Sequence, residues 1–329
     1  MDIYEQVDNW KDKRILLIGE ALIDRYIFGN AESISPDAPV PNVKISENRI
    51  HLGAIGLVLQ YVRSLGGNPD ICTILGNDYE GDFFFNELKR LNFSNENVIV
   101  DENISTPQIT RIKAMGQHVL RLETDFSKEL SSDTTKNLLS VIEAQSNNYD
   151  SIVILDYGAG ELFQDVFIQQ LLSILKRKCK DCPIIVRPNT SNYYLYEDVD
   201  LIKINLQKAL NQFSIDCCTE TSVSIVGKRI LNSTKCNNVF LNYLETASYL
   251  FIKNKERVEA FNPILNQPVR SYVAVGSAIM AILGLAFAAD VPVSQSIQSS
   301  LYAAVLSAIS PPVNFFSAKE LSEFIISEK

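Results

Sequence analysis

Short runs of consecutive apolar residues recur along the chain and are separated by stretches of helical character. Runs of this length are typical of the central strands of a parallel sheet, which are buried on both faces. The predicted strands are Lys13–Gly19, Asp70–Gly76, Ser151–Asp156, Pro183–Pro188, Leu201–Gln207 and Val239–Leu244. The predicted helices include Val58–Gly66, one within Gly76–Asn92, Ser131–Gln145 and Ser300–Ser310. Strands that alternate with helices predict right-handed βαβ units, and so an α/β fold with a mainly parallel central sheet flanked by helices.

The stretch Arg270–Ala289 differs from the other helical patterns because its apolar residues cover every side. Residues Ala278–Ala289 carry no charge, and Asp290 and Pro292 then end the run. The run is too short to cross a bilayer, which takes about 20 residues. It predicts a helix buried on all sides in a large core. If its start lies beside a pocket, the free backbone N–H groups there would attract an anion such as phosphate.

Two further patterns predict non-helical structure. Ile34–Pro41 holds three prolines in six residues, which exclude a helix and favour an extended, rigid segment. Ile109–Met115 and His118–Leu122 read as two strands, with Gly116 and Gln117 as the turn between them.

Composition and charge narrow the choice of partners. The chain has 329 residues, a formal net charge of −9 and a pI of about 4.9, so neither nucleic acid nor an anionic membrane is expected as a partner. The N-terminal residues lack the apolar region of a signal peptide, and we expect a cytoplasmic protein. Cys179 and Cys182 form a C-x-x-C, but no second pair or histidine pair accompanies them. We therefore expect reduced thiols and no metal site.

The residues Ser271–Ser277 carry a resemblance to a family. Ribokinase-like (PfkB) sugar kinases have the motif D-T/V-x-G-A-G-D here, in which a glycine-rich turn directs amides at the transferring phosphate. In those kinases the final Asp takes the proton from the sugar hydroxyl. In this chain Ser277 stands at that position, Gly276 is the surviving glycine, and Ala274 and Val275 complete the corresponding anion hole. Ser277 is then either a weakened catalytic residue or nucleophile, or a helix N-cap, for which serine is favoured.

Ile34–Pro41 is similar to the same stretch of the bacterial heptose-7-phosphate kinases, at the spacing that they use after D-R-Y. The resemblance implies a ribokinase-like domain over residues 11–329, with a small β-lid formed by residues 25–49 and 108–123. In that family the lid covers the sugar pocket and often forms a dimer interface. The bifunctional heptose enzymes also carry a nucleotidyltransferase domain after the kinase, and we expect none in this chain.

The resemblance also implies the residues of a sugar pocket. The candidates are Asp24, Gly53, Leu57, Asp156 and Arg187. Leu57 stands where the family has an Asn that contacts the sugar, and Arg187 stands where the family usually has an Asp, which reverses the charge. Asp24 is either a sugar ligand or a turn residue. Arg187 either binds an anion or pairs with a carboxylate.

The residues expected on the nucleotide side also differ from the family's motifs. Asn205 is retained from the motif T-P-N-x-x-E, but the Glu that helps to organise magnesium is replaced by Lys208. An ammonium group there repels a divalent cation. The Lys that heptose kinases carry after D-Y is Ala159 in this chain.

The first hypothesis is therefore a pseudokinase that has lost phosphotransfer and acts by binding a sugar phosphate, a nucleotide or a protein partner. For it we expect no cofactor. The alternative is an active ATP-dependent, heptose-phosphate-like kinase with a relocated base, Asp156 or Asp24, which would need ATP and Mg²⁺. A third hypothesis is a structural subunit of an oligomer. A homodimer through the lid is expected.

Overall fold

A nine-stranded sheet forms the centre of the described part of the chain. The computed structural model describes residues 3–125, 130–158 and 162–328. The strand order is β13-β12-β11-β10-β9-β8-β1-β4-β5, and all neighbours are parallel except the pairs made by β12 and β13. The strands are β1 (Arg14–Gly19), β4 (Asn68–Gly76), β5 (Val98–Asp101), β8 (Ser151–Leu155), β9 (Ile184–Arg187), β10 (Leu201–Asn205), β11 (Asn238–Asn242), β12 (Ser248–Ile252) and β13 (Glu259–Phe261).

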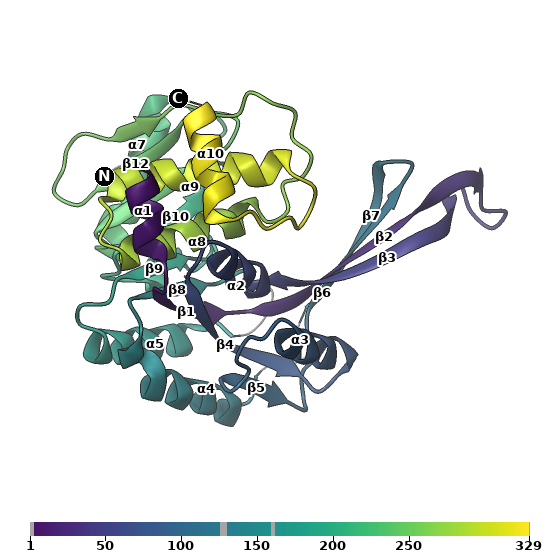
Figure 1. Ribbon diagram of the computed structural model, residues 1–329, viewed down its shortest axis with the longest axis horizontal. Helices are drawn as coiled ribbons and strands as arrows, with labels where there is room; N and C mark the ends of the chain where they lie inside the picture. The colour runs from purple at the N-terminus through teal and green to yellow at the C-terminus, as the bar shows by residue number, and fades with distance from the viewer. Residues whose placement is uncertain (1–2, 126–129, 159–161, 329) are drawn as a thin grey trace.

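Helices cover both faces of this sheet (Figure 1). On β1, Ile15 and Leu17 belong to one hydrophobic core, while Leu16 and Ile18 belong to the other. The first core holds α1 (Ile3–Trp10), α2 (Ile55–Ser64), α3 (Tyr79–Arg90), α8 (Val275–Ala288), α9 (Val293–Ile309) and α10 (Ala318–Ser327). The second holds α4 (Ser132–Gln145), α5 (Asp165–Lys178), α6 (Leu206–Gln212) and α7 (Glu220–Thr234). The predicted α/β fold with a mainly parallel sheet is confirmed, because strand residues alternate between two apolar layers.

Helix α8 lies deep in the first core, as its composition predicts. Its residues from Ala278 to Ala286 are buried. The Ser151 hydroxyl on β8 donates a hydrogen bond to the carbonyl of Gly284 over 2.8 Å. A Cβ at Gly284 would lie 2.8 Å from a methyl group of Val153, so glycine permits this close approach of helix and strand. No helix of the described residues is both long and apolar enough for a membrane span.

A second, four-stranded sheet, here called the arm sheet, projects from the body (Figure 1). It consists of β2 (Ala21–Ile34), β3 (Pro41–Ala54), β6 (Gln108–Ala114) and β7 (Gln117–Thr124), in the order β3-β2-β6-β7. The hairpin predicted from the sequence is present as β6 and β7, and Gly116 in its turn has φ 78°. The prediction of an extended segment at Ile34–Pro41 is wrong. The chain reverses there between β2 and β3, closed by a 2.8 Å hydrogen bond from the amide of Ser35 to the carbonyl of Val40.

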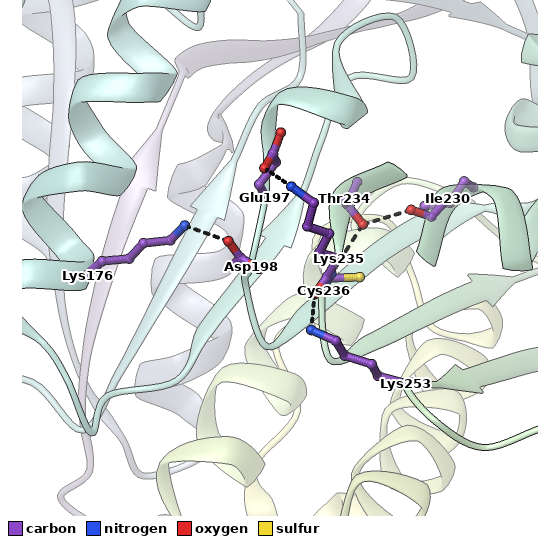
Figure 2. A network of polar contacts seen from close by, with 8 residues as sticks. All are labelled: Lys176, Glu197, Asp198, Ile230, Thr234, Lys235, Cys236 and Lys253. Carbon is purple, nitrogen blue, oxygen red and sulfur yellow. Dashed lines mark hydrogen bonds and ion pairs between the residues drawn. The ribbon is translucent and has the colours of Figure 1, made fainter. Parts of the chain in front are cut away.

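A polar network joins the segments that precede β10 and β11 (Figure 2). The ammonium of Lys235 contacts Glu197 over 3.0 Å, and that of Lys176 contacts Asp198 over 3.4 Å. Lys253 donates to the carbonyl of Lys235 over 2.7 Å. The network lies at the amino ends of parallel strands. Exposed ion pairs of this kind contribute about 0–1 kcal/mol each, so we assign it a modest structural role.

Candidate functional site

A pocket of about 280 Å³ lies at the carboxyl ends of four neighbouring strands, β8 to β11. In parallel sheets this edge gathers the residues that follow each strand, and ligands of open α/β proteins bind there. The start of α8 closes the pocket from the side. Its lining residues are Asp156, Tyr157, Arg187, Pro188, Asn189, Thr190, Lys203, Ile204, Asn205, Lys208, Asn242, Tyr243, Leu244, Glu245, Tyr272, Val275 and Gly276.

The first turn of α8 presents free amides to this pocket. The helix begins at Val275, and its N-cap residue Ala274 makes no side-chain capping hydrogen bond. Among the described residues, the amides of Val275, Gly276 and Ser277 have no hydrogen-bond partner. Val275 and Gly276 line the pocket. The helix start therefore offers donors and a positive dipole end to an anion.

One expectation for this turn is corrected. Ser277 is not the N-cap, because the helix starts two residues earlier and Ser277 is its third residue. Ala274 takes the left-handed conformation, with φ 71°. The turn that the family builds with glycine is thus formed here by an alanine, at some cost in backbone strain.

Replacing Ala274 by glycine is expected to stabilise the protein by about 0.5–1 kcal/mol, because glycine adopts a positive φ without strain. Chemical denaturation measures the change. The matched control is Ala286→Gly, within the same helix, which is expected to lose about 1 kcal/mol. If both variants lose stability, the left-handed position of Ala274 does not carry the strain inferred here.

Ser277 is buried beneath the pocket rather than open to it. It is 5% exposed and does not line the cavity. Its side chain faces the hydroxyl of Tyr157, although the pair does not meet hydrogen-bond geometry. Burial raises the pKa of Tyr157, and the nearby Arg187 acts in the opposite direction. Where the resemblance places the family's base, this chain therefore has the hydroxyl of Ser277 beside that of Tyr157.

Three cationic side chains line the pocket. Arg187 stacks on the ring of Tyr157, 3.9 Å from its centroid, and donates to the carbonyl of Asp156 over 3.1 Å. Lys203 on β10 is 5% exposed, and its Nζ lies 4.0 Å from where a Cβ of Gly276 would stand. Lys208 is exposed on α6. None of the three pairs with a carboxylate of the described residues, so the expected alternative of an Arg187–carboxylate pair is not found there.

Two carboxylates of the described residues line the pocket, and both have hydrogen-bond partners. Asp156 accepts hydrogen bonds from the Tyr196 hydroxyl over 2.9 Å and the Gly158 amide over 3.0 Å, and burial raises its pKa. Glu245 accepts from the hydroxyls of Tyr243 and Tyr272. Neither carboxylate neutralises the three cations directly.

The sugar-pocket candidates fall into two groups. Asp156 and Arg187 line the pocket, whereas Asp24, Gly53 and Leu57 do not. Asp24 on β2 is buried and forms an ion pair with Arg111 of β6. A Cβ at Gly53 would lie 3.0 Å from the Asp24 carboxylate, so Gly53 permits the close approach of β3.

Leu57 differs from the other candidates because it lies inside the body. It sits on α2 and is buried in the first hydrophobic core. Leu57 therefore offers a hypothetical sugar no polar contact.

Comparisons with known proteins agree with this architecture. No protein-family model matches the chain. The bifunctional protein HldE of Syntrophotalea carbinolica is 25% identical over 286 residues, 87% of this chain and 57% of that protein. HldE of Helicobacter pylori is 29% identical over 276 residues, which cover 83% of this chain and 58% of that protein. Phosphofructokinase-2 from Escherichia coli superposes with a TM-score of 0.75 at 14% identity, covering 96% of this chain and 99% of that one.

Arabidopsis thaliana ribokinase, solved with ribose and ATP, gives a TM-score of 0.74 at 13% identity over 95% of this chain and 99% of the ribokinase chain. The chain is a relative of the ribokinase-like sugar kinases. The resemblance predicted from the motifs, including that to the heptose kinases, is confirmed. The chain spans a little more than half the length of its HldE relatives.

The nucleotide-side residues of this ribokinase-like chain do not suit magnesium. Mg²⁺ needs octahedral oxygen ligands, mostly carboxylates, phosphates and water. By the resemblance, Lys208 stands where the family has an acidic residue, and the carboxylates of Asp156 and Glu245 accept hydrogen bonds from tyrosine hydroxyls. Asn205 is in the pocket, but its side chain accepts the amide of Lys208 over 3.1 Å and caps α6. Ala159 lies outside the described residues.

Sequence reasoning overlooked several pocket residues of the ribokinase-like fold. Lys203 is the most informative, because a lysine in the middle of the apolar run Leu201–Asn205 signals a buried charge. Tyr157, Asn242 and Tyr272 carry no comparable signal. They reach the pocket because their strands and turns end at the same edge of the sheet.

Proposed function

We propose that this chain is a pseudokinase of the ribokinase-like group, which has lost phosphotransfer and binds a sugar phosphate, a nucleotide or a protein partner. The observation that carries the proposal is the residue at the base position. Ser277 is buried, and its hydroxyl group cannot take a proton from a sugar near neutral pH. Loss of a general base costs about 10²–10⁴ in rate.

Further departures support the same conclusion. Lys208 replaces an acid on the magnesium side, and Leu57 replaces a polar contact on the sugar side. The turn before α8 keeps its free amides, so the anion hole is not counted among the losses. A neighbour could compensate for one such loss, whereas losses at the base, magnesium and sugar positions are hard to compensate together.

A coupled phosphotransfer assay with ATP, Mg²⁺ and a panel of sugars and sugar phosphates tests the proposal. The expected result is turnover at least about 10⁴-fold below the 1–100 per second typical of kinases. Turnover within that typical range would overturn it.

Ser277→Asp is the matched variant for this assay. We expect it to restore little activity, because the alanine in the turn and Lys208 remain. A large recovery from this single change would show that the other departures matter less than proposed.

The alternative is an active, heptose-phosphate-like kinase whose base is Asp156 or Asp24. Asp156 favours it most, because it lines the pocket and burial raises its pKa toward the range of a general base. This alternative requires that ATP with Mg²⁺ stabilise the protein, by about 2.7 kcal/mol at 100 times the dissociation constant. Asp24 is less suited, because it is held by Arg111.

We also propose that the arm sheet acts as the lid of this domain and joins two copies of the chain in a homodimer. Apolar side chains are exposed on it, including Ile45, Leu120 and Leu122. A chain of this size rarely exposes many apolar residues on one element without a partner. The domain extent of residues 11–329 is part of the same proposal.

A further inference from the structure

Lys203 is a buried ammonium group that has no partner among the described residues, and it reaches the pocket. It lies on the central strand β10, is 5% exposed and lines the cavity beside Gly276. Within the described ranges it makes neither a hydrogen bond nor an ion pair. Buried charges are normally paired, because removing an unpaired charge from water costs several kcal/mol of folding free energy. An unpaired lysine that borders a cavity therefore points to a ligand that brings the negative charge.

Two more cations and the helix start converge on the same cavity. Arg187 comes from the end of β9 and Lys208 from the first turn of α6. Both contribute to the field at Lys203, so they lie near its ammonium group. The free amides of Val275 and Gly276 come from α8, which lies later in the chain than the elements that carry the three cations. Four elements thus supply donors to one anion.

The facing acids offset this positive charge only in part. Asp156 and Glu245 are the carboxylates among the described pocket-lining residues, and they accept hydrogen bonds from tyrosine hydroxyls and a backbone amide. Those neutral donors leave the carboxylate charges in place, so three cations face two carboxylates. A divalent cation placed in this pocket would face the charges of Arg187, Lys203 and Lys208. The donor set therefore favours a bare anion over a magnesium complex.

We propose that this pocket binds a phosphate-bearing anion directly, without a divalent cation, through Lys203, Arg187, Lys208 and the first amides of α8. The inference rests on the proposed function and defines its ligand class. Nucleotide and sugar phosphates share the chemistry that these groups recognise. The cations of the chain take the place that a metal ion would otherwise fill.

Protonation of Lys203 gives the proposed site a pH dependence. Burial, followed by Arg187 and Lys208, lowers the pKa of Lys203 to about 7. The ammonium form is the one that attracts an anion, so affinity should fall as pH rises above 7. Arg187, Lys208, Asp156 and Glu245 face the same cavity, and burial followed by Arg187 lowers the pKa of Lys208 as well.

Calorimetry and thermal shift with ATP, ADP, glucose 6-phosphate and inorganic phosphate test the proposal. Each ligand is measured in EDTA, and then with excess Mg²⁺ at matched ionic strength. We expect at least one of them to bind in EDTA, and ATP affinity to fall when Mg²⁺ neutralises its phosphates. The nucleotide and sugar-phosphate arms identify the source of the phosphate. Absence of binding by every ligand in EDTA, or an ATP affinity that Mg²⁺ raises or leaves unchanged, overturns the proposal.

Variants locate the binding site. Lys203→Met is expected to weaken binding in EDTA by about tenfold or more, the loss of one charge-assisted hydrogen bond. Lys208→Glu changes an exposed residue and so keeps the fold; it should weaken binding similarly and reverse the effect of Mg²⁺. The control is Lys228→Glu, the same charge change at an exposed lysine of α7 that does not line the pocket. Equal losses of affinity in all three variants would mean that the ligand binds outside this pocket.

The outcomes separate this inference from the proposed function. Measurable turnover together with metal-free binding refutes only the loss of activity. Absent turnover without metal-free binding refutes only the anion site.

Discussion

Replacing Lys203 by methionine is expected to stabilise the ligand-free protein by about 1–4 kcal/mol below pH 7. The wild-type protein buries this ammonium group beside Arg187 and Lys208 without a carboxylate partner among the described residues. Methionine has a similar length and fills the space without a charge. The same change weakens the proposed anion binding, so stability and function are expected to move in opposite directions.

The pH dependence of this effect has a definite sign. The pKa of Lys203 is lowered to about 7 in the folded protein, against about 10.4 in an unfolded chain. Between these values the unfolded state binds the additional proton, so this group makes the wild type more stable as pH rises. The methionine variant therefore exceeds the wild type in free energy of unfolding most below pH 7, and the difference becomes smaller toward pH 9.

Denaturant unfolding of both proteins at several pH values between 6 and 9 measures the difference. Lys228→Met serves as the control, because Lys228 is exposed on α7 and its replacement should change stability little at any pH. A Lys203→Met variant that is less stable than the wild type throughout this range would show that Lys203 has a stabilising partner.

Replacing Gly81, a buried glycine in the first turn of α3, by valine is expected to cost about 3 kcal/mol or more. Gly81 belongs to the motif Gly76-x-Asp78-x-x-Gly81 at the start of α3. A Cβ at Gly81 would lie 2.1 Å from the carbonyl oxygen of Gly76. That oxygen is part of the backbone at the end of β4, so it cannot rotate away as a side chain would.

The clash would also disturb the cap of α3. The Asp78 carboxylate accepts the amide of Gly81 over 2.8 Å and that of Thr106 over 2.7 Å. Thermal unfolding measures the loss. The control is Gly276→Ala, where an added Cβ meets only the Lys203 Nζ at 4.0 Å, and where alanine in a helix should be neutral or gain up to about 1 kcal/mol. Similar stability of Gly81→Val and wild type would mean that β4 and α3 can separate at this point.

The strands and the central helix could be predicted because their signals are local. Lys13–Gly19 and Ser151–Asp156 were predicted as buried strands and match β1 and β8 within one residue at each end. Ser131–Gln145 was predicted as a helix with a serine start, and Ser131 is its N-cap. Apolar periodicity and capping residues depend on near neighbours in the chain, so a single sequence records them.

Boundaries near turns were less predictable. The helix predicted at Val58–Gly66 begins at Ile55, directly after β3. The strand predicted at Leu201–Gln207 ends at Asn205, because the side chain of Asn205 caps α6. The prolines of Ile34–Pro41 correctly excluded a helix. The segment is not extended, because β2 pairs antiparallel with β3 and the chain must reverse direction between them. In each case a neighbouring element determined where the helix or strand begins or ends.

The sequence by itself determined the α/β class of this protein, its resemblance to the ribokinase-like kinases and the absence of a carboxylate at position 277. Tertiary structure alone decided that Arg187, Lys203 and Lys208 share one pocket, and that Ala274 rather than Ser277 is the N-cap of α8. The physical reason is the range of the forces involved. Hydrophobic patterning acts over a few residues, whereas the order β8-β9-β10-β11 brings together charges that lie far apart along the chain.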